Sequence, residues 1–147
     1  MKKYLLILII ALIMPRMAMA HCQIPCGIYD DELRFEALEE DVATIKKSIA
    51  QINLISASNG KDFNQLVRWV NNKEEYSNKI IDVMSNYFLA QRIKPDHKNY
   101  EKMLKSVHNV IVFAMKNKQN SDVKIADELQ NNLDELRSLY IEKKHEH

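Results

Sequence analysis

The chain has 147 residues, of which only two are glycine and two are cysteine, and its formal net charge is +1. This length allows one domain of ordinary size. Because glycine makes up about 7% of an average protein, its scarcity argues against a glycine-rich phosphate loop, a dinucleotide-binding fold and an all-β fold with many tight turns. The nearly neutral charge gives no general sign of nucleic-acid binding, and we expect no nucleic-acid partner.

Residues 1–20 have the three parts of a secretory signal peptide. Lys2 and Lys3 precede an apolar run over residues 4–14, and Ala-Met-Ala at positions 18–20 is a typical signal-peptidase site. The apolar run is shorter than the about 20 residues that a membrane span needs, so an uncleaved anchor is the less favoured alternative. We predict cleavage after Ala20, which leaves 127 residues with a formal charge of −2. The mature protein is then expected in a periplasm or outside the cell, without membrane attachment.

Four stretches of the mature chain repeat apolar residues at spacings of three and four, which marks the core-facing side of a helix. The first stripe runs from Leu38 to Ile52 and ends at the polar residues 56–60. The second begins with apolar residues between Phe63 and Val70 and resumes at residues 81–88. Polar residues 71–75 interrupt it, and we expect this interruption to face a partner, a site or solvent.

The third stripe runs from Tyr100 to Ala114, and the fourth from Leu129 to Tyr140, with Asp122 or Ser121 as the expected N-cap. The methionines within the stripes are expected to lie in the core. Short breaks between helices favour antiparallel neighbours. The sequence therefore predicts an all-α fold in which residues 31–147 form an antiparallel up-down four-helix bundle.

Residues 21–30 read His-Cys-Gln-Ile-Pro-Cys-Gly-Ile-Tyr-Asp and contain both cysteines of the chain. One interpretation is a Cys22–Cys26 disulfide, since two cysteines in an exported protein often pair. The other is a metal chelate. Cleavage frees the α-amine of His21, whose ordinary pKa of about 7.7–8.0 lets it bind a metal near neutral pH. With the Cys22 amide nitrogen and the two thiolates, it makes a planar N2S2 set that suits Ni(II) or Cu(II), and the His21 imidazole is available as an axial ligand.

This segment resembles the amino-terminal hook of the nickel superoxide dismutase family. The family pattern His-Cys-x-x-Pro-Cys-Gly-x-Tyr is matched by His21, Cys22, Pro25, Cys26, Gly27 and Tyr29. The resemblance implies one nickel ion per subunit, superoxide as the substrate and a homohexameric assembly. It also implies that His21, Cys22 and Cys26 bind the metal, that Pro25 and Gly27 shape the turn between the cysteines, and that Tyr29 takes part in catalysis at the opening of the site.

Two further segments resemble the family. Arg34-Phe35-Glu36-Ala37 is similar to its Arg-Ile-Glu-Ala, which implies that Glu36 orients the His21 imidazole. Asn86-Tyr87-Phe88 is similar to its Asp-Tyr-Phe, which implies that Tyr87 lines the opening beside Tyr29. The basic partner that some members place near this glutamate has no clear counterpart, and Arg68 and Asn72 are the candidates.

Two alternative functions are compatible with the same residues. The first is an exported helical binding protein with a Cys22–Cys26 disulfide and no metal. The second is a copper or nickel carrier that uses the same chelate without turnover.

Overall fold

The computed structural model describes residues 31–58 and 62–141. The predicted signal peptide (1–20) and hook (21–30) lie outside the described residues. Within the described ranges there is no strand, and the helices are α2 (Asp31–Ala57), α3 (Phe63–Asp82), the π-helix η1 (Val83–Arg92), α4 (Tyr100–Gln119) and α5 (Val123–Ile141). None of these helices is long and apolar enough to cross a membrane.

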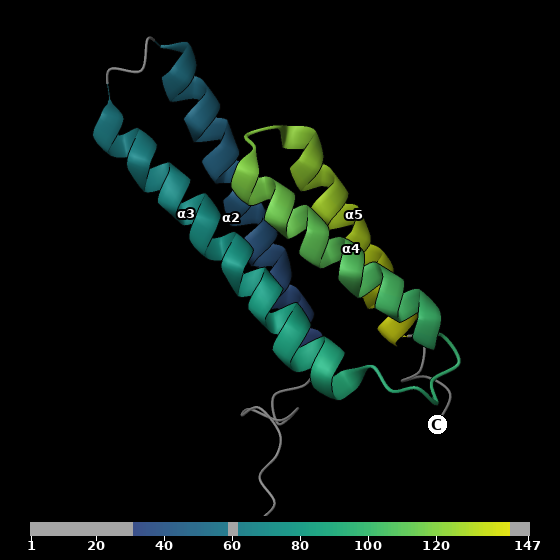
Figure 1. Ribbon diagram of the computed structural model, residues 1–147. Coiled ribbons are helices and arrows are strands. Elements are labelled where there is room, and N and C mark those ends of the chain that lie inside the picture. Colours follow the sequence, from purple (N-terminus) through teal and green to yellow (C-terminus); the bar gives the residue numbers. More distant parts are fainter. Residues whose placement is uncertain (1–30, 59–61, 142–147) are drawn as a thin grey trace, which may run out of the picture.

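The helices form the predicted antiparallel bundle (Figure 1). Contacts join α2 to α3 and α5, and α4 to α3 and α5, so each helix packs against two neighbours. The apolar stripes meet in one core, in which the residues of the first, third and fourth stripes are largely buried. Met84 and Met103 are fully buried, as predicted. The N-cap of α5 is Asp122, whose Oδ1 accepts a hydrogen bond from the Lys124 amide at 3.0 Å.

The α2–α3 hairpin projects beyond the α4–α5 pair (Figure 1). The turn between α4 and α5 meets α2 at Asn53, whose Nδ2 donates to the Ser121 carbonyl at 3.1 Å. Beyond that level none of the other described helices covers the hairpin, and the exposed fractions of Leu54, Phe63 and Val67 are 63%, 70% and 56%. The prediction that the second stripe faces the core from Phe63 onward is therefore wrong for its first residues. We call Leu54, Phe63 and Val67 the hairpin tip.

The polar interruption at residues 71–75 belongs to one continuous helix and meets the end of α4. Lys73 is only 3% exposed. Its Nζ donates to the carbonyl of Asn117 and, at 2.7 Å, to that of Lys118. These carbonyls belong to the last turn of α4 and lack partners within their own helix. The expectation that this stretch faces a partner, a site or solvent is thus wrong for Lys73, which satisfies a neighbouring helix end.

The second helix changes its hydrogen-bond pattern over its last ten residues, η1. A π-helix pairs residues five apart and is rare, usually a single turn near a functional site. Here the Ile93 amide donates to the Phe88 carbonyl at 3.0 Å, and Gln91 Nε2 donates to the Asn86 carbonyl at 2.8 Å. Pro95 follows and prevents further helix. The change brings residues five apart onto one side of the helix.

Candidate functional site

A network of polar side chains surrounds Asp31, at the end of the bundle where α2 begins and η1 and α5 end (Figure 1). Asp31 Oδ1 accepts a hydrogen bond from the Tyr87 hydroxyl and lies 3.1 Å from Arg92 Nη2. Asp31 Oδ2 accepts from the Tyr140 hydroxyl at 2.7 Å. Arg92 Nη2 also donates to the Tyr87 hydroxyl at 2.8 Å. The Asp31 carboxylate therefore links α2 to η1 and α5. We call Asp31, Tyr87, Arg92 and Tyr140 the Asp31 network.

Aromatic rings form the base of the Asp31 network. The ring centroids of Phe35 and Phe88 are 4.8 Å apart, and Tyr140 packs against both at 5.6 Å. The guanidinium carbon of Arg34 lies 4.4 Å from the centroid of the Tyr87 ring, within the range of a cation–π contact. The network therefore rests on a layer of packed aromatic rings.

The surroundings of Asp31, Tyr87 and Tyr140 determine which of them is ionised. Burial raises the pKa of Asp31, but the hydrogen bonds from Tyr87 and Tyr140 and the charge of Arg92 outweigh burial, so its pKa lies below the ordinary value. Burial and the neighbouring Asp31 raise the pKa of both tyrosines. At neutral pH, Asp31 is thus an ionised acceptor and both tyrosines are protonated donors.

A second cluster of charges lies on the same part of α2. Arg137 of α5 forms ion pairs with both Glu32 and Glu39. Glu36 lies between these two glutamates in the sequence and is exposed. Within residues 31–58 and 62–141, its carboxylate makes no hydrogen bond or ion pair. Its carboxylate therefore remains available to a group outside those ranges.

The residues predicted from the hook pattern are His21, Cys22, Pro25, Cys26, Gly27 and Tyr29, and all of them lie outside the described residues. Tyr87 is 1% exposed, and its hydroxyl proton is donated to Asp31. Arg68 and Asn72 lie in the first half of α3, which runs antiparallel to α2, so they are far along the bundle from Glu36. Neither is close enough to be its basic partner.

Three members of the network were absent from the predicted site. Asp31 follows the hook motif directly, but no motif singles it out. Tyr140 belongs to the fourth apolar stripe, and its hydroxyl is the signal that could identify it, since a buried hydroxyl needs a partner. Arg92 lies five residues after Tyr87, a spacing that an α-helix does not bring together.

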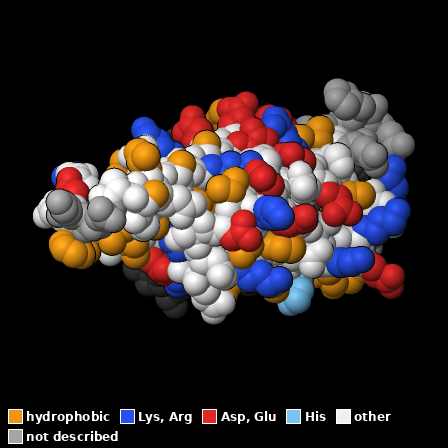
Figure 2. Space-filling model, turned by 90° about the horizontal axis from the view of Figure 1, so that it is seen from above, with side chains coloured by type: hydrophobic (Ala, Val, Ile, Leu, Met, Phe, Trp, Pro, Cys, Tyr) orange, Lys and Arg blue, Asp and Glu red, His pale blue; other side chains and the backbone are white. Residues whose placement is uncertain are grey.

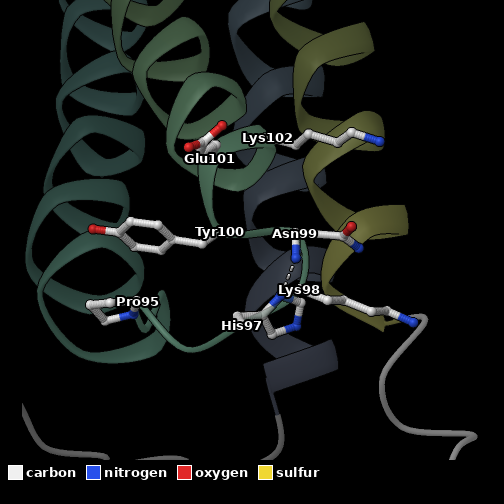
Figure 3. A pocket seen from close by; sticks show the side chains of 7 residues that line it. All are labelled: Pro95, His97, Lys98, Asn99, Tyr100, Glu101 and Lys102. Atoms are coloured by element: carbon white, nitrogen blue, oxygen red, sulfur yellow. Dashed lines mark hydrogen bonds between the residues drawn. The ribbon is translucent and has the colours of Figure 1, made fainter.

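No other part of the described surface is as clear a candidate site as the Asp31 network. Pro95 and residues 97–102 line an open pocket of about 330 Å³ at the start of α4, where His97 Nδ1 accepts a hydrogen bond from the Asn99 amide at 3.0 Å (Figure 3). The face in Figure 2 carries positive and negative side chains interspersed, with apolar ones gathered at the left end, where the hairpin lies. Among the described residues, no group of three or more His, Cys, Asp or Glu side chains could hold a metal ion.

A comparison with protein-family models gives a match to this chain. The family model described as nickel-containing superoxide dismutase matches residues 16–144. No curated protein and no solved structure gives a significant match. The matched range includes both cysteines and the whole described bundle.

Proposed function

The chain belongs to the nickel-containing superoxide dismutase family, and from that premise we propose that its nickel site is the segment that begins at His21. Family membership makes the protein an oxidoreductase that acts on superoxide and uses nickel. The reaction converts two superoxide ions and two protons into dioxygen and hydrogen peroxide. The observation that carries the proposal is that the family match includes Cys22 and Cys26, the only cysteines of the chain.

The donor atoms of this segment fit nickel. We propose that one ion per subunit is held by the α-amine of His21, the amide nitrogen and thiolate of Cys22, and the thiolate of Cys26. When bound, nickel supplies a one-electron redox couple. Thiolates and an anionic amide donate electron density, and ligand choice of this kind tunes the potential of a metal centre. Pro25 and Gly27 shape the turn that returns the second thiolate.

Residues of the described bundle are proposed to support that segment. The imidazole of His21 would be a further ligand, oriented by a hydrogen bond to Glu36, whose carboxylate is exposed and unpartnered among the described residues. Along α2, Glu36 lies about 7.5 Å from Asp31 at 1.5 Å per residue. Tyr29 is proposed to line the opening and hydrogen-bond the substrate. Tyr87 has its proton committed to Asp31, so it would join Tyr29 only by exchanging that bond.

Export and assembly complete the proposal. The ligand set requires a free amine at His21, so cleavage after Ala20 in the course of export to a periplasm or the cell exterior is part of it. A homohexamer is proposed from family resemblance. The exposed apolar side chains of the hairpin tip support assembly, because large apolar side chains exposed at one end of a protein often mark a contact with a partner.

The decisive experiment compares the chain that begins at His21 with a chain that retains Ala20, with both N-termini verified by mass spectrometry. Retaining Ala20 converts the amine ligand into a peptide nitrogen. We expect the chain that begins at His21 to bind about one nickel per subunit, to show a rhombic Ni(III) electron paramagnetic resonance signal and to dismutate superoxide. The extended chain should keep its helical circular dichroism and lose the activity. Equal activity in both chains would overturn the amine-ligand proposal.

Cysteine variants separate the alternatives. Cys22→Ser and Cys26→Ser should each abolish nickel redox activity with little loss of helicity. A carrier would bind nickel without turnover, and a disulfide-bonded binding protein would contain no free thiol and no nickel. A chain with an intact His21 terminus and reduced thiols that fails to bind nickel would contradict the proposed function.

A further inference from the structure

Two tyrosines from different helices donate to one carboxylate. The Tyr87 hydroxyl of η1 donates to Oδ1 of Asp31, and the Tyr140 hydroxyl of α5 donates to Oδ2 at 2.7 Å. Burial alone would raise the pKa of Asp31, but the two tyrosines and Arg92 hold it below the ordinary value. The carboxylate is therefore ionised at neutral pH and can accept a proton from either hydroxyl.

Aromatic packing connects the two tyrosine rings. Tyr87 and Tyr140 both meet the Phe88 ring edge-on, with centroids 5.4 Å and 5.6 Å from it. Phe35 packs against Tyr140 at 5.6 Å and against Phe88 at 4.8 Å. Both hydroxyls and both rings thus belong to one closely packed cluster, within which an electron can pass from one tyrosine to the other.

This arrangement suits the loss of one electron from a tyrosine. Removing an electron from the ring makes the phenol hydroxyl a strong acid, because the positive charge lies on the ring that carries it. A base at hydrogen-bond distance takes the proton in the same step and so avoids a charged ring. Asp31 is such a base for both tyrosines, and its carboxylate is held in place by Arg92 Nη2 at 3.1 Å.

The surroundings favour Tyr140 over Tyr87 as the residue that loses the electron. The Tyr87 hydroxyl accepts a hydrogen bond from Arg92, and the guanidinium carbon of Arg34 lies 4.4 Å from the Tyr87 ring centroid. Positive charge so close to a ring opposes the removal of an electron. Among the described residues, the Tyr140 hydroxyl is bonded only to Asp31. Beside it, a cavity of about 20 Å³ has room for one water-sized molecule.

We propose that Tyr140 is a redox-active residue that gives one electron to an oxidising radical such as the carbonate radical, while its hydroxyl proton passes to Asp31. The O–H bond of Tyr140 breaks, an O–H bond forms at Asp31 Oδ2, and Tyr140 becomes a neutral phenoxyl radical as the carbonate radical is reduced to carbonate. Superoxide, the substrate of the family, then gives one electron to the phenoxyl oxygen, Asp31 returns the proton, and dioxygen is released. The cycle consumes one oxidising radical and one superoxide ion without nickel, and so goes beyond the proposed function.

The test uses the mature chain, without added Ni²⁺ so that no Ni(III) signal overlaps. Pulse radiolysis of a bicarbonate buffer generates carbonate radicals, and optical absorption and electron paramagnetic resonance detect tyrosyl radicals on the protein. Tyr140→Phe removes the phenol, and Asp31→Asn keeps the shape of the side chain but removes the base. Tyr76→Phe is the matched control, because Tyr76 is partly buried like Tyr140 but its hydroxyl has no hydrogen-bond partner within the described residues.

We expect Tyr140→Phe to lose more than half of the tyrosyl signal and Tyr76→Phe to keep it. Asp31→Asn should form the radical more slowly than the unaltered chain. In heavy water the rate should fall more for the unaltered chain than for Asp31→Asn, because only the unaltered chain passes the proton to a bound base in the same step. A burst of superoxide should shorten the lifetime of the tyrosyl signal.

Three outcomes would contradict the proposal. Equal tyrosyl signals in Tyr140→Phe and Tyr76→Phe, or a tryptophan radical in place of the tyrosyl radical, would mean that the Asp31 network serves the fold alone. A tyrosyl lifetime that superoxide does not change would rule out the return step. If Asp31→Asn fails to fold, the signal of Tyr140→Phe and the heavy-water rate of the unaltered chain decide the question in the same way.

Discussion

Arg92 and Tyr87 lie five residues apart in η1, and Arg92 Nη2 donates to the Tyr87 hydroxyl at 2.8 Å. In an α-helix the residues that face one another are three or four apart. The π-helical pattern of η1 removes this restriction, because its hydrogen bonds pair residues five apart. Both side chains can then approach Asp31 at the start of α2.

Tyr87→Phe tests how much the hydrogen bond from Tyr87 to Asp31 contributes to the free energy of unfolding. The substitution keeps the ring, which packs edge-on against Phe88, and removes the hydroxyl that donates to Asp31. We expect the free energy of unfolding to fall by about 1–2 kcal/mol, the usual cost when a partly buried charged acceptor loses one donor. Urea denaturation at pH 7 measures it. Tyr76→Phe is the control, since no hydrogen bond of the Tyr76 hydroxyl occurs within the described residues, and equal losses in both variants would contradict the assignment.

Most of the fold could be predicted from the spacing of apolar residues. The stripes containing Val107 and Leu133 are buried as expected. The failure at Phe63 and Val67 has a simple cause. Periodicity identifies the apolar side of a helix, but it does not say how far the neighbouring helices extend. Here α4 ends, and α5 begins, at the level of Asn53, short of these residues.

The site could be predicted only in part. A local motif indicated Tyr87, but Asp31 and Arg92 carry no motif, and their proximity depends on a π-helix that apolar periodicity does not reveal. Lys73 was missed for a related reason, because its partners are carbonyl groups of α4 that are distant in the sequence. The metal ligands from His21 to Cys26 remain a prediction.

Asp41 should make stability depend on pH. Burial raises its pKa to about 6 from an ordinary value of 3.8, opposed by Lys79 and reinforced by Glu40. The folded state therefore binds the proton more tightly than the unfolded state, so this contribution favours folding at low pH and is lost as pH rises from about 4 to 6. Asp41→Asn should raise the free energy of unfolding at pH 7 by about 1 kcal/mol. Thermal melts at pH 4 and pH 7 should show the gain only at pH 7, and a gain of equal size at both would contradict the prediction.

Lys73 should stabilise the end of α4. Lys73→Met keeps the length of the side chain and removes the donor to the Asn117 and Lys118 carbonyls. We expect a loss of about 1–2 kcal/mol in the free energy of unfolding, because at least one buried carbonyl is left unpaired. Lys79→Met is the matched control, since Lys79 is an exposed lysine of the same helix that pairs with Glu75 at 3.1 Å and lies over the Tyr76 ring at 3.9 Å. Its loss should cost less than the loss of Lys73. If Lys73→Met is neutral, removal of the buried charge offsets the lost hydrogen bonds.

The hairpin tip should contribute to assembly. Phe63→Gln and Val67→Gln replace side chains that are 70% and 56% exposed in the single chain, so the fold of the subunit should be retained. Burying a large apolar side chain at an interface contributes about 1.5–3 kcal/mol, and about 1.4 kcal/mol corresponds to a tenfold change in affinity. Each substitution should therefore weaken subunit association at least tenfold, which sedimentation velocity at micromolar protein concentrations measures.

Met115→Gln provides the comparison for the hairpin tip, because Met115 is 42% exposed but lies on α4. It changes the same kind of surface without touching the projecting hairpin, so association should be unaffected. If all three variants remain as associated as the unaltered chain, the hairpin tip is not an interface. If the unaltered chain itself sediments as a monomer, the homohexamer expected from the family is wrong for this protein. In that case the exposed apolar side chains follow only from the greater length of α2 and of the α3–η1 helix compared with α4 and α5.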